Sequence, residues 1–386
     1  MVKVDKLYFV IVALLYYVGI FAIYVAGLPI SIRISITAIC GLLCLPAVIR
    51  LLNDTRLVIV LAFAGACWAA SFVYNGNYPV KDAIESLLYF MIGCGLYYGL
   101  TNADEATYRI GQRICRITAG IMLLVLLAEM ALAGLGGNFL NYISHNYVSV
   151  LGLIPLALFT GFDAKRQPSI ILALAYCALC TLAIGRGGVI TALFILVATL
   201  VFKIISNRAN QKRLILYILL AVIVILAAWL LAQNGWISRT FFKFLNNNYE
   251  STRLSFWGDY IAQCLSNAQD LVFGPNLSSI ASVSALGGNT HNSLLQMHAS
   301  FGLFCTALMV VISIKAGATY FRNGCYSSFT IFAALLLRSM SDRLFFPLYM
   351  EPLLYCFLFA ALLREPVLKN EMDLRNVVED ELDGSR

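Results

Sequence analysis

Few side chains in this chain of 386 residues could do acid–base chemistry, and two of them flank the start of one apolar run. His291 precedes that run, and His298 follows seven positions later, two helical turns along on roughly the same face. Histidine changes charge between pH 5 and 8, so His291 suits a general base. His298 is equally consistent with a satisfied core residue. With His145 as the third histidine, no HxxxH or HExxH spacing occurs, and no metal site is predicted.

Arg186 is the first of two arginines that could bind an anion. It lies in AIGRGGVI, between two apolar stretches with almost no polar loop around it. A guanidinium in such a place is costly unless it faces a wet cavity or an anion. The glycines on either side allow a tight turn and the close approach of a ligand. The alternative is an arginine that extends to the membrane interface.

Arg253 is the second, in the segment NNNYESTRLSFWGDY. Ser251 is a plausible N-cap, which would place Arg253 in the first turn of an amphipathic helix lying on the membrane surface. In the alternative reading Trp257 is only an interface anchor, and Arg253 pairs with Glu250 or Asp259.

The elements that must position these residues are transmembrane helices. The chain is 61% hydrophobic and 12% charged, whereas a soluble protein needs roughly 25% charged residues. Strand alternation is absent, and apolar stretches have the length that a helix needs to cross a bilayer. We therefore predict an all-α polytopic bundle of about twelve spans, near residues 7–25, 34–52, 57–73, 86–100, 117–135, 148–162, 169–184, 188–205, 214–232, 293–314, 326–340 and 345–363.

Basic residues set the orientation of these spans. If the chain starts in the cytoplasm, 19 of the 27 Lys and Arg residues fall on the cytoplasmic side, so both termini are predicted there. The net charge of +7 then reflects topology and not nucleic-acid binding. Four regions follow: residues 1–233 with about nine spans, a large periplasmic loop at 234–292 with short amphipathic helices, about three spans at 293–363, and an acidic cytoplasmic tail at 364–386. Long loops are often functional.

The order of these pieces resembles the bacterial O-antigen ligase and O-antigen/capsule polymerase superfamily, which are C-type membrane glycosyltransferases. The resemblance covers about residues 180–310. It is carried by Arg186, by Arg253 with Trp257, by Phe273-Gly274-Pro275, and by His291-Asn292 with Leu295 and Gly302.

The resemblance implies transfer of a glycan from an undecaprenyl-diphosphate donor at the periplasmic face of the inner membrane, without cofactor or metal. Arg186 and Arg253 would hold the diphosphate leaving group, and His291 would take the proton from the acceptor hydroxyl. A single displacement would invert the anomeric configuration. Further substrate contacts could come from Asn292, Trp257, His298, Arg338, Asp342 and Arg343. The last three could equally form an interfacial ion-pair cluster.

The sequence is consistent with three functions. A polymerase would use a second lipid-linked glycan as acceptor, with a chain-length regulator as a further partner, whereas a ligase would use lipid A–core. Cys305 stands where the ligase pattern has Gly, Thr or Tyr, and RSMSDRLFFP looks more like polymerases, so polymerase is favoured. A lipid-linked oligosaccharide transporter is the alternative of another class, disfavoured because the two halves differ.

Overall fold

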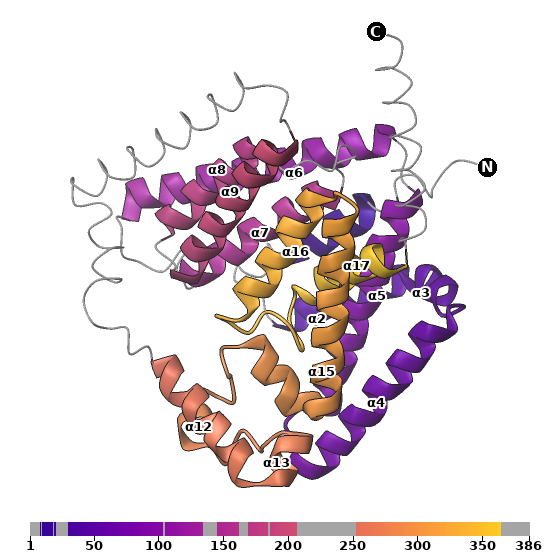
Figure 1. Ribbon diagram of the computed structural model, residues 1–386. Helices are drawn as coiled ribbons and strands as arrows, with labels where there is room; N and C mark the ends of the chain where they lie inside the picture. Colours follow the sequence, from indigo (N-terminus) through magenta and orange to yellow (C-terminus); the bar gives the residue numbers. More distant parts are fainter. Residues whose placement is uncertain are drawn as a thin grey trace.

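The computed structural model describes residues 8, 10–17, 19–20, 30–102, 105–133, 145–161, 169–183, 186–206 and 252–363. Within some helices only the backbone is described, as at Arg186 and His145. All regular elements in these ranges are α-helices, which confirms the predicted all-α class (Figure 1). The predicted span at 214–232, the start of the large loop and the acidic tail lie outside the described residues.

The helices before residue 207 supply most of the bundle. Their bounds are α2 Ile30–Leu43, α3 Leu45–Leu51, α4 Thr55–Asn75, α5 Val80–Asn102, α6 Glu105–Ala133, α7 His145–Gly161, α8 Ile170–Leu182 and α9 Arg186–Ser206. The later helices are α12 Thr252–Ser266, α13 Ala268–Phe273, α14 Ala281–Ser284, α15 Ser293–Arg322, α16 Tyr326–Ser339 and α17 Glu351–Leu362.

Several of these helices suit a multi-pass membrane protein. By length and composition four could cross a bilayer: α4, α5, residues 187–205 of α9, and α15. The pair α2 and α3 forms a fifth candidate, bent by 52°, where one span was predicted at residues 34–52. Pro46 stands in the first turn of α3, and a proline cannot continue the hydrogen-bond ladder of α2. Shorter apolar helices cover residues 147–160, 170–181 and 351–362.

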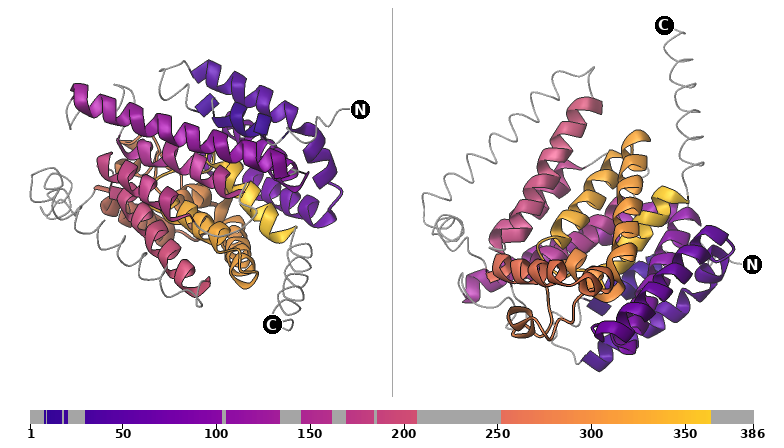
Figure 2. Two further views of the ribbon diagram at one scale, coloured as in Figure 1. Left: turned by 90° about the horizontal axis from the view of Figure 1, so that it is seen from above. Right: turned by 60° about the horizontal axis from the view of Figure 1, so that its bottom comes forward.

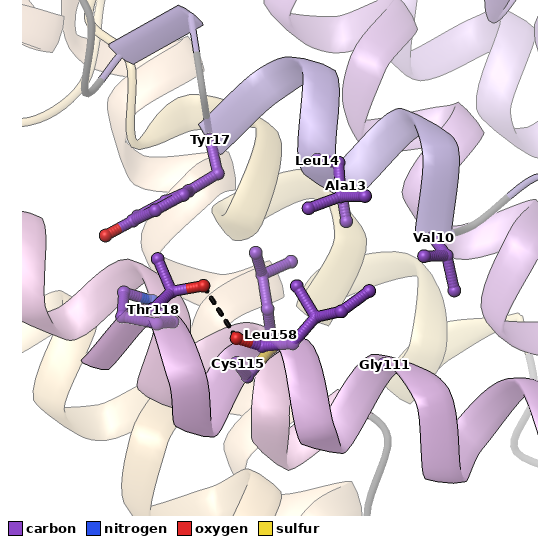
Figure 3. A pocket seen from close by; sticks show the side chains of 10 residues that line it. Val10, Ala13, Leu14, Tyr17, Gly111, Cys115, Thr118 and Leu158 are labelled. Atoms are coloured by element: carbon purple, nitrogen blue, oxygen red, sulfur yellow. Dashed lines mark hydrogen bonds between the residues drawn. The ribbon is translucent and has the colours of Figure 1, made fainter. Parts of the chain in front are cut away.

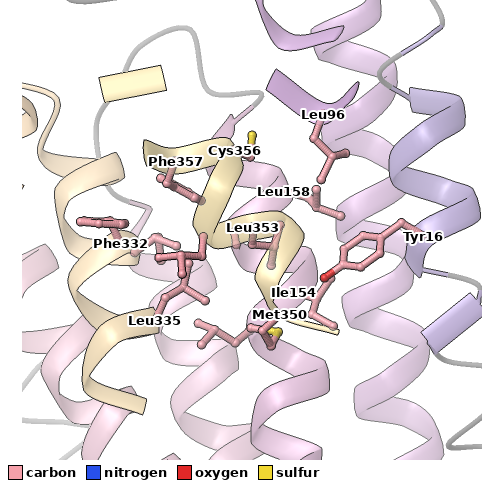
Figure 4. Packing of buried hydrophobic residues seen from close by; sticks show 14 of the residues in the cluster. Tyr16, Leu96, Ile154, Leu158, Phe332, Leu335, Met350, Leu353, Cys356 and Phe357 are labelled. Carbon is pink, nitrogen blue, oxygen red and sulfur yellow. The ribbon is translucent and has the colours of Figure 1, made fainter. Parts of the chain in front are cut away.

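Helix α17 lies at the centre of the apolar core (Figure 4). Its side chains at Leu353, Cys356 and Phe357 are buried against residues from α5, α7 and α16. The approach of α5 is close because Gly93 has no side chain: a Cβ there would lie 2.7 Å from the Cβ of Tyr355 and 3.0 Å from the Pro352 carbonyl oxygen. Gly93 therefore sets the distance between α5 and α17.

The segment from α12 to α14 builds a second, smaller core over the first turns of α15. Phe256, Tyr260 and Cys264 recur at helical spacing on α12 and pack with Val283 and with Ala299 of α15. Short helices were expected in this part of the chain, and α12 begins at the residue that follows the expected N-cap.

Asn75, the last residue of α4, and Asn77, two positions later, connect this segment to the bundle. The Asn75 amide donates to the carbonyls of Phe273, Gly274 and Ala299, each at 3.0 Å. Asn77 donates to Ala299 at 3.1 Å and accepts from the Leu277 N–H at 2.7 Å. Buried backbone carbonyls need hydrogen-bond donors, and here side chains about 200 residues away in the chain supply them. These hydrogen bonds join the two segments.

Gly93→Ala tests the close packing of α5 on α17. Because the new methyl group meets backbone and a Cβ that cannot move aside, we expect destabilisation of about 1–3 kcal/mol. At Gly65, in the middle of α4, nothing lies within 4 Å of the added Cβ. Gly65→Ala should therefore stabilise by about 0.5–1 kcal/mol. Thermal unfolding in detergent measures both, and equal effects of the two changes would contradict this packing.

Candidate functional site

Three cationic or titratable side chains from separate segments converge on the carboxylate of Asp342. The Nδ1 atom of His291 lies 3.2 Å from Oδ1, and Nη2 of Arg338 lies 3.3 Å from Oδ2. Nη2 of Arg253 lies 4.0 Å from the same Oδ2. The side chain of Asp342 is 3% exposed and that of Arg338 is 1% exposed, whereas Arg253 and His291 are 28% and 26% exposed. The cluster therefore has a buried side and an open side.

Each partner reaches Asp342 for a local reason. Arg338 is in the last turn of α16, four residues before Asp342, and the helix ends between them. Arg253 is in the first turn of α12 and also donates to the Ser341 carbonyl. His291 stands in the turn before α15 with φ of +48°, a conformation that non-glycine residues seldom adopt. The backbone N–H of His291 donates to Oδ1 of Asn289 at 2.9 Å.

The turn around His291 is fixed by its neighbours. Asn292 caps α15 by accepting the N–H groups of Leu294 and Leu295, and its amide donates to the Met340 carbonyl at 3.1 Å. The Ser293 hydroxyl donates to the carbonyl of Asp342 at 3.1 Å. These bonds lock the start of α15 against the segment that follows α16. Asn292, expected as a substrate contact, thus has a capping role in the fold.

Trp257 also supports this turn. Its indole N–H donates to the Thr290 carbonyl at 2.8 Å, next to His291 in the chain. One position earlier, Phe256 places its ring centroid 6.0 Å from that of His291. Helix α12 therefore brings both Arg253 to the carboxylate and Trp257 to the histidine turn.

Arg186 is the first residue of α9, and its side chain lies outside the described residues. The backbone beside it does contact the cluster. A Cβ on Gly187 would lie 2.7 Å from Oγ of Ser341 and 3.3 Å from Nη1 of Arg338, and one on Gly188 would lie 2.4 Å from the Cβ of Ser149. The two glycines were expected to admit a ligand. In the structure they admit the cluster's own side chains.

Three residues near the cluster were missed by the sequence analysis. Ser149 of α7 accepts from Nε of Arg338 at 3.4 Å, and Ser341 accepts from Nη1 at 3.0 Å. The Tyr147 phenol lies within electrostatic range of Asp342 and of the three nearby arginines, Arg253, Arg338 and Arg343. Serines and a tyrosine at helix ends are common in any sequence, so no local pattern distinguishes these.

Two other predicted site residues lie outside this network. His298 has both ring nitrogens engaged, with the Tyr260 hydroxyl at 2.7 Å and the Leu271 carbonyl at 2.8 Å, and it links α12, α13 and α15. Arg343 donates to the Phe346 carbonyl at 3.1 Å. Among the described residues its buried Nε has no hydrogen-bond partner.

The charges around Asp342 keep it ionised. Burial alone would raise the pKa of its carboxyl group, but the hydrogen bond from His291 and the positive charges of Arg338 and Arg253 outweigh burial. The net result is a pKa below the ordinary value. A carboxylate in this place accepts the Nδ1–H of His291, which leaves the lone pair of Nε2 to accept a proton.

The cluster is thus suited to proton transfer beside a site for an anion. His291 is oriented as a base, and Arg253 is a partly exposed cation whose planar head can bind phosphate oxygens. Within the described ranges no group of three His, Cys, Asp or Glu side chains is placed to hold a metal ion.

Comparison with known proteins adds no relative: no protein-family model matches the chain, and no curated protein matches it.

Asp342→Asn tests the electrostatic role of this carboxylate through pH. Because the folded-state pKa is lowered, the stability it contributes is present above the unfolded-state pKa of about 3.9 and is lost as pH falls through the lower folded value. We expect the unfolding temperature of the wild type to fall more steeply below about pH 4 than that of the variant. Thermal unfolding at stepped pH measures this, and parallel curves would contradict it.

Proposed function

We propose that the chain is a membrane glycosyltransferase that transfers a glycan from a polyprenyl-diphosphate donor to a sugar hydroxyl. Within that class we favour a polysaccharide polymerase of the O-antigen or capsule kind. The resemblance over residues 180–310 suggested this class. The observation that carries the proposal is that His291 and Arg253, 38 positions apart, meet at one buried carboxylate, with the start of α9 alongside.

The donor would be bound through its diphosphate. Cleavage of the sugar–phosphate bond leaves the lipid diphosphate with an additional negative charge, and fixed cations that face it lower the barrier. Arg253 is the partly exposed cation on the open side of the cluster. Arg186 is the first residue of α9, and the start of α9 packs against the cluster. Arg338 is fully buried against Asp342 and Ser149, so we assign it the task of holding Asp342 and not of binding substrate.

The acceptor would be activated by His291. Its Nε2 takes the proton of the acceptor hydroxyl as the oxygen attacks the anomeric carbon, and the carbon–oxygen bond to the diphosphate breaks on the opposite face. Asp342 stabilises the imidazolium that forms. The product carries the inverted configuration. The pre-activated diphosphate donor supplies the free energy, so the residues need supply only orientation, a base and positive charge.

The predicted topology agrees with this chemistry. About twelve spans in a bacterial inner membrane, with both termini in the cytoplasm, would put the cluster at the periplasmic face, where lipid-linked glycans are polymerised. Four apolar helices of spanning length support a multi-pass protein.

Substitution of the proposed catalytic residues tests the function. In a deletion strain, His291→Ala should fail to restore high-molecular-weight glycan, because loss of a general base costs about 10²–10⁴ in rate. Arg253→Ala and Arg186→Ala should fail similarly, by about 10²–10³, because the leaving group loses a fixed charge. Gel electrophoresis of lipopolysaccharide and capsule measures this, with membrane levels of each variant checked.

Arg56→Ala is the matched control, because Arg56 is an exposed arginine that pairs with Asp54, outside the cluster. It should complement fully. Core with a single repeat unit, or loss of long capsule, identifies a polymerase. Bare core with polymer kept on the lipid carrier identifies a ligase instead. Full complementation by well-expressed His291→Ala would refute the catalytic assignment and reopen the transporter alternative.

A further inference from the structure

An apolar cavity of about 180 Å³ lies between α6, α7 and α8, and none of the residues of the Asp342 cluster lines it. Its lining includes Gly120 of α6, Gly152, Pro155 and Phe159 of α7, and Leu172 and Tyr176 of α8. For scale, an apolar cavity of about 150 Å³ in another protein is large enough to bind benzene. Figure 1 shows α6 at the top of the fold and α12 and α13 at the bottom, and Figure 2 gives two further views of the same arrangement.

A cation stands at one end of this cavity. Arg116 of α6 is exposed, and its guanidinium carbon lies 5.7 Å from the ring centroid of Phe159. Arg113 and Arg109 lie three and seven positions earlier on the same exposed side of the helix. The apolar cavity therefore ends at a row of positively charged side chains. Such a site suits an amphiphile that has an apolar chain and an anionic head group.

The other end of the cavity is closed. A Cβ on Gly152 would lie 2.2 Å from Cδ2 of Leu179, so α7 and α8 are in direct contact there. The Tyr176 hydroxyl donates to the Ser149 carbonyl at 2.8 Å and seals the same end. By contrast, nothing lies within 4 Å of a Cβ on Gly120. A chain can thus enter beside α6 but cannot continue to the Asp342 cluster.

A neighbouring cavity shows that this space is not general loose packing. It shares Cys115 and Pro155 with the larger one and lies between α6, α7 and the helical residues before position 20 (Figure 3). Its volume is only about 20 Å³, room for about one water molecule.

We propose that the larger cavity binds one acyl chain of an anionic phospholipid whose phosphate lies at Arg116. The chain would run about 10 Å along α7, from Phe159 to Gly152. Arg113 and Arg109 would add positive charge around the head group. This site is independent of the proposed transfer reaction, because the contact between Gly152 and Leu179 separates the two.

Native mass spectrometry of the purified full-length chain tests the head-group contact. Wild type should bind phosphatidylglycerol in preference to phosphatidylcholine with the same acyl chains. Arg116→Gln should reduce that preference about tenfold, because a charge-assisted contact is lost. Arg50→Gln is the matched control, since Arg50 is also exposed and lies 4.7 Å from an aromatic ring, that of Tyr98. It should keep the wild-type preference.

A second pair of variants tests the cavity. Gly120→Leu fills the open space beside α6 and should lower the binding of both lipids. Gly65→Leu adds the same side chain to an exposed position of α4 and should leave binding unchanged. Wild-type lipid binding by folded Gly120→Leu, or wild-type preference in Arg116→Gln, would overturn the proposal. Displacement of bound phosphatidylglycerol by polyprenyl phosphate but not by added phosphatidylglycerol would overturn it too.

Discussion

A carboxylate that is almost fully buried must be neutralised where it lies, and the arrangement around Asp342 follows from that need. Arg338 lies beside it because α16 ends one turn earlier. Arg253 and His291 can reach it only if α12 lies across the start of α15, and Gly187 must be small for α9 to begin against Arg338. Loss of any one of these placements would weaken the neutralisation of this buried carboxylate.

The two histidines of α15 and its preceding turn show how the environment separates similar residues. His298 is buried, and its two ring nitrogens are both bonded to protein groups, so it has no capacity left for a substrate. His291 is partly exposed and uses one nitrogen on Asp342. The same side-chain type thus holds helices together at one position and is oriented for proton transfer at the other.

The all-α class and several long apolar helices could be predicted from the sequence, whereas twelve spans were predicted and four or five helices of spanning length lie in the described residues. Apolar length predicted α4, α5, α9 and α15 because lipid requires it. The spacing around Arg253 and Trp257 predicted α12. The 52° bend between α2 and α3 was missed, although Pro46 is visible in the sequence. Asp342 as the common partner of Arg253 and His291 could not be predicted, because contacts 51 or more residues apart depend on how helices pack.

Helix α4 is held to the rest of the protein chiefly along one side and by Asn75 at its end. Its apolar side chains at Ile59, Phe63 and Val73 are 63%, 40% and 85% exposed (Figure 1 shows α4 at the outer edge). In water such a surface would favour collapse or association, whereas in hydrocarbon it carries no penalty. The surrounding apolar solvent is therefore a part of the fold. It keeps α4 in the position from which Asn75 and Asn77 hydrogen-bond to the segment that carries the candidate site.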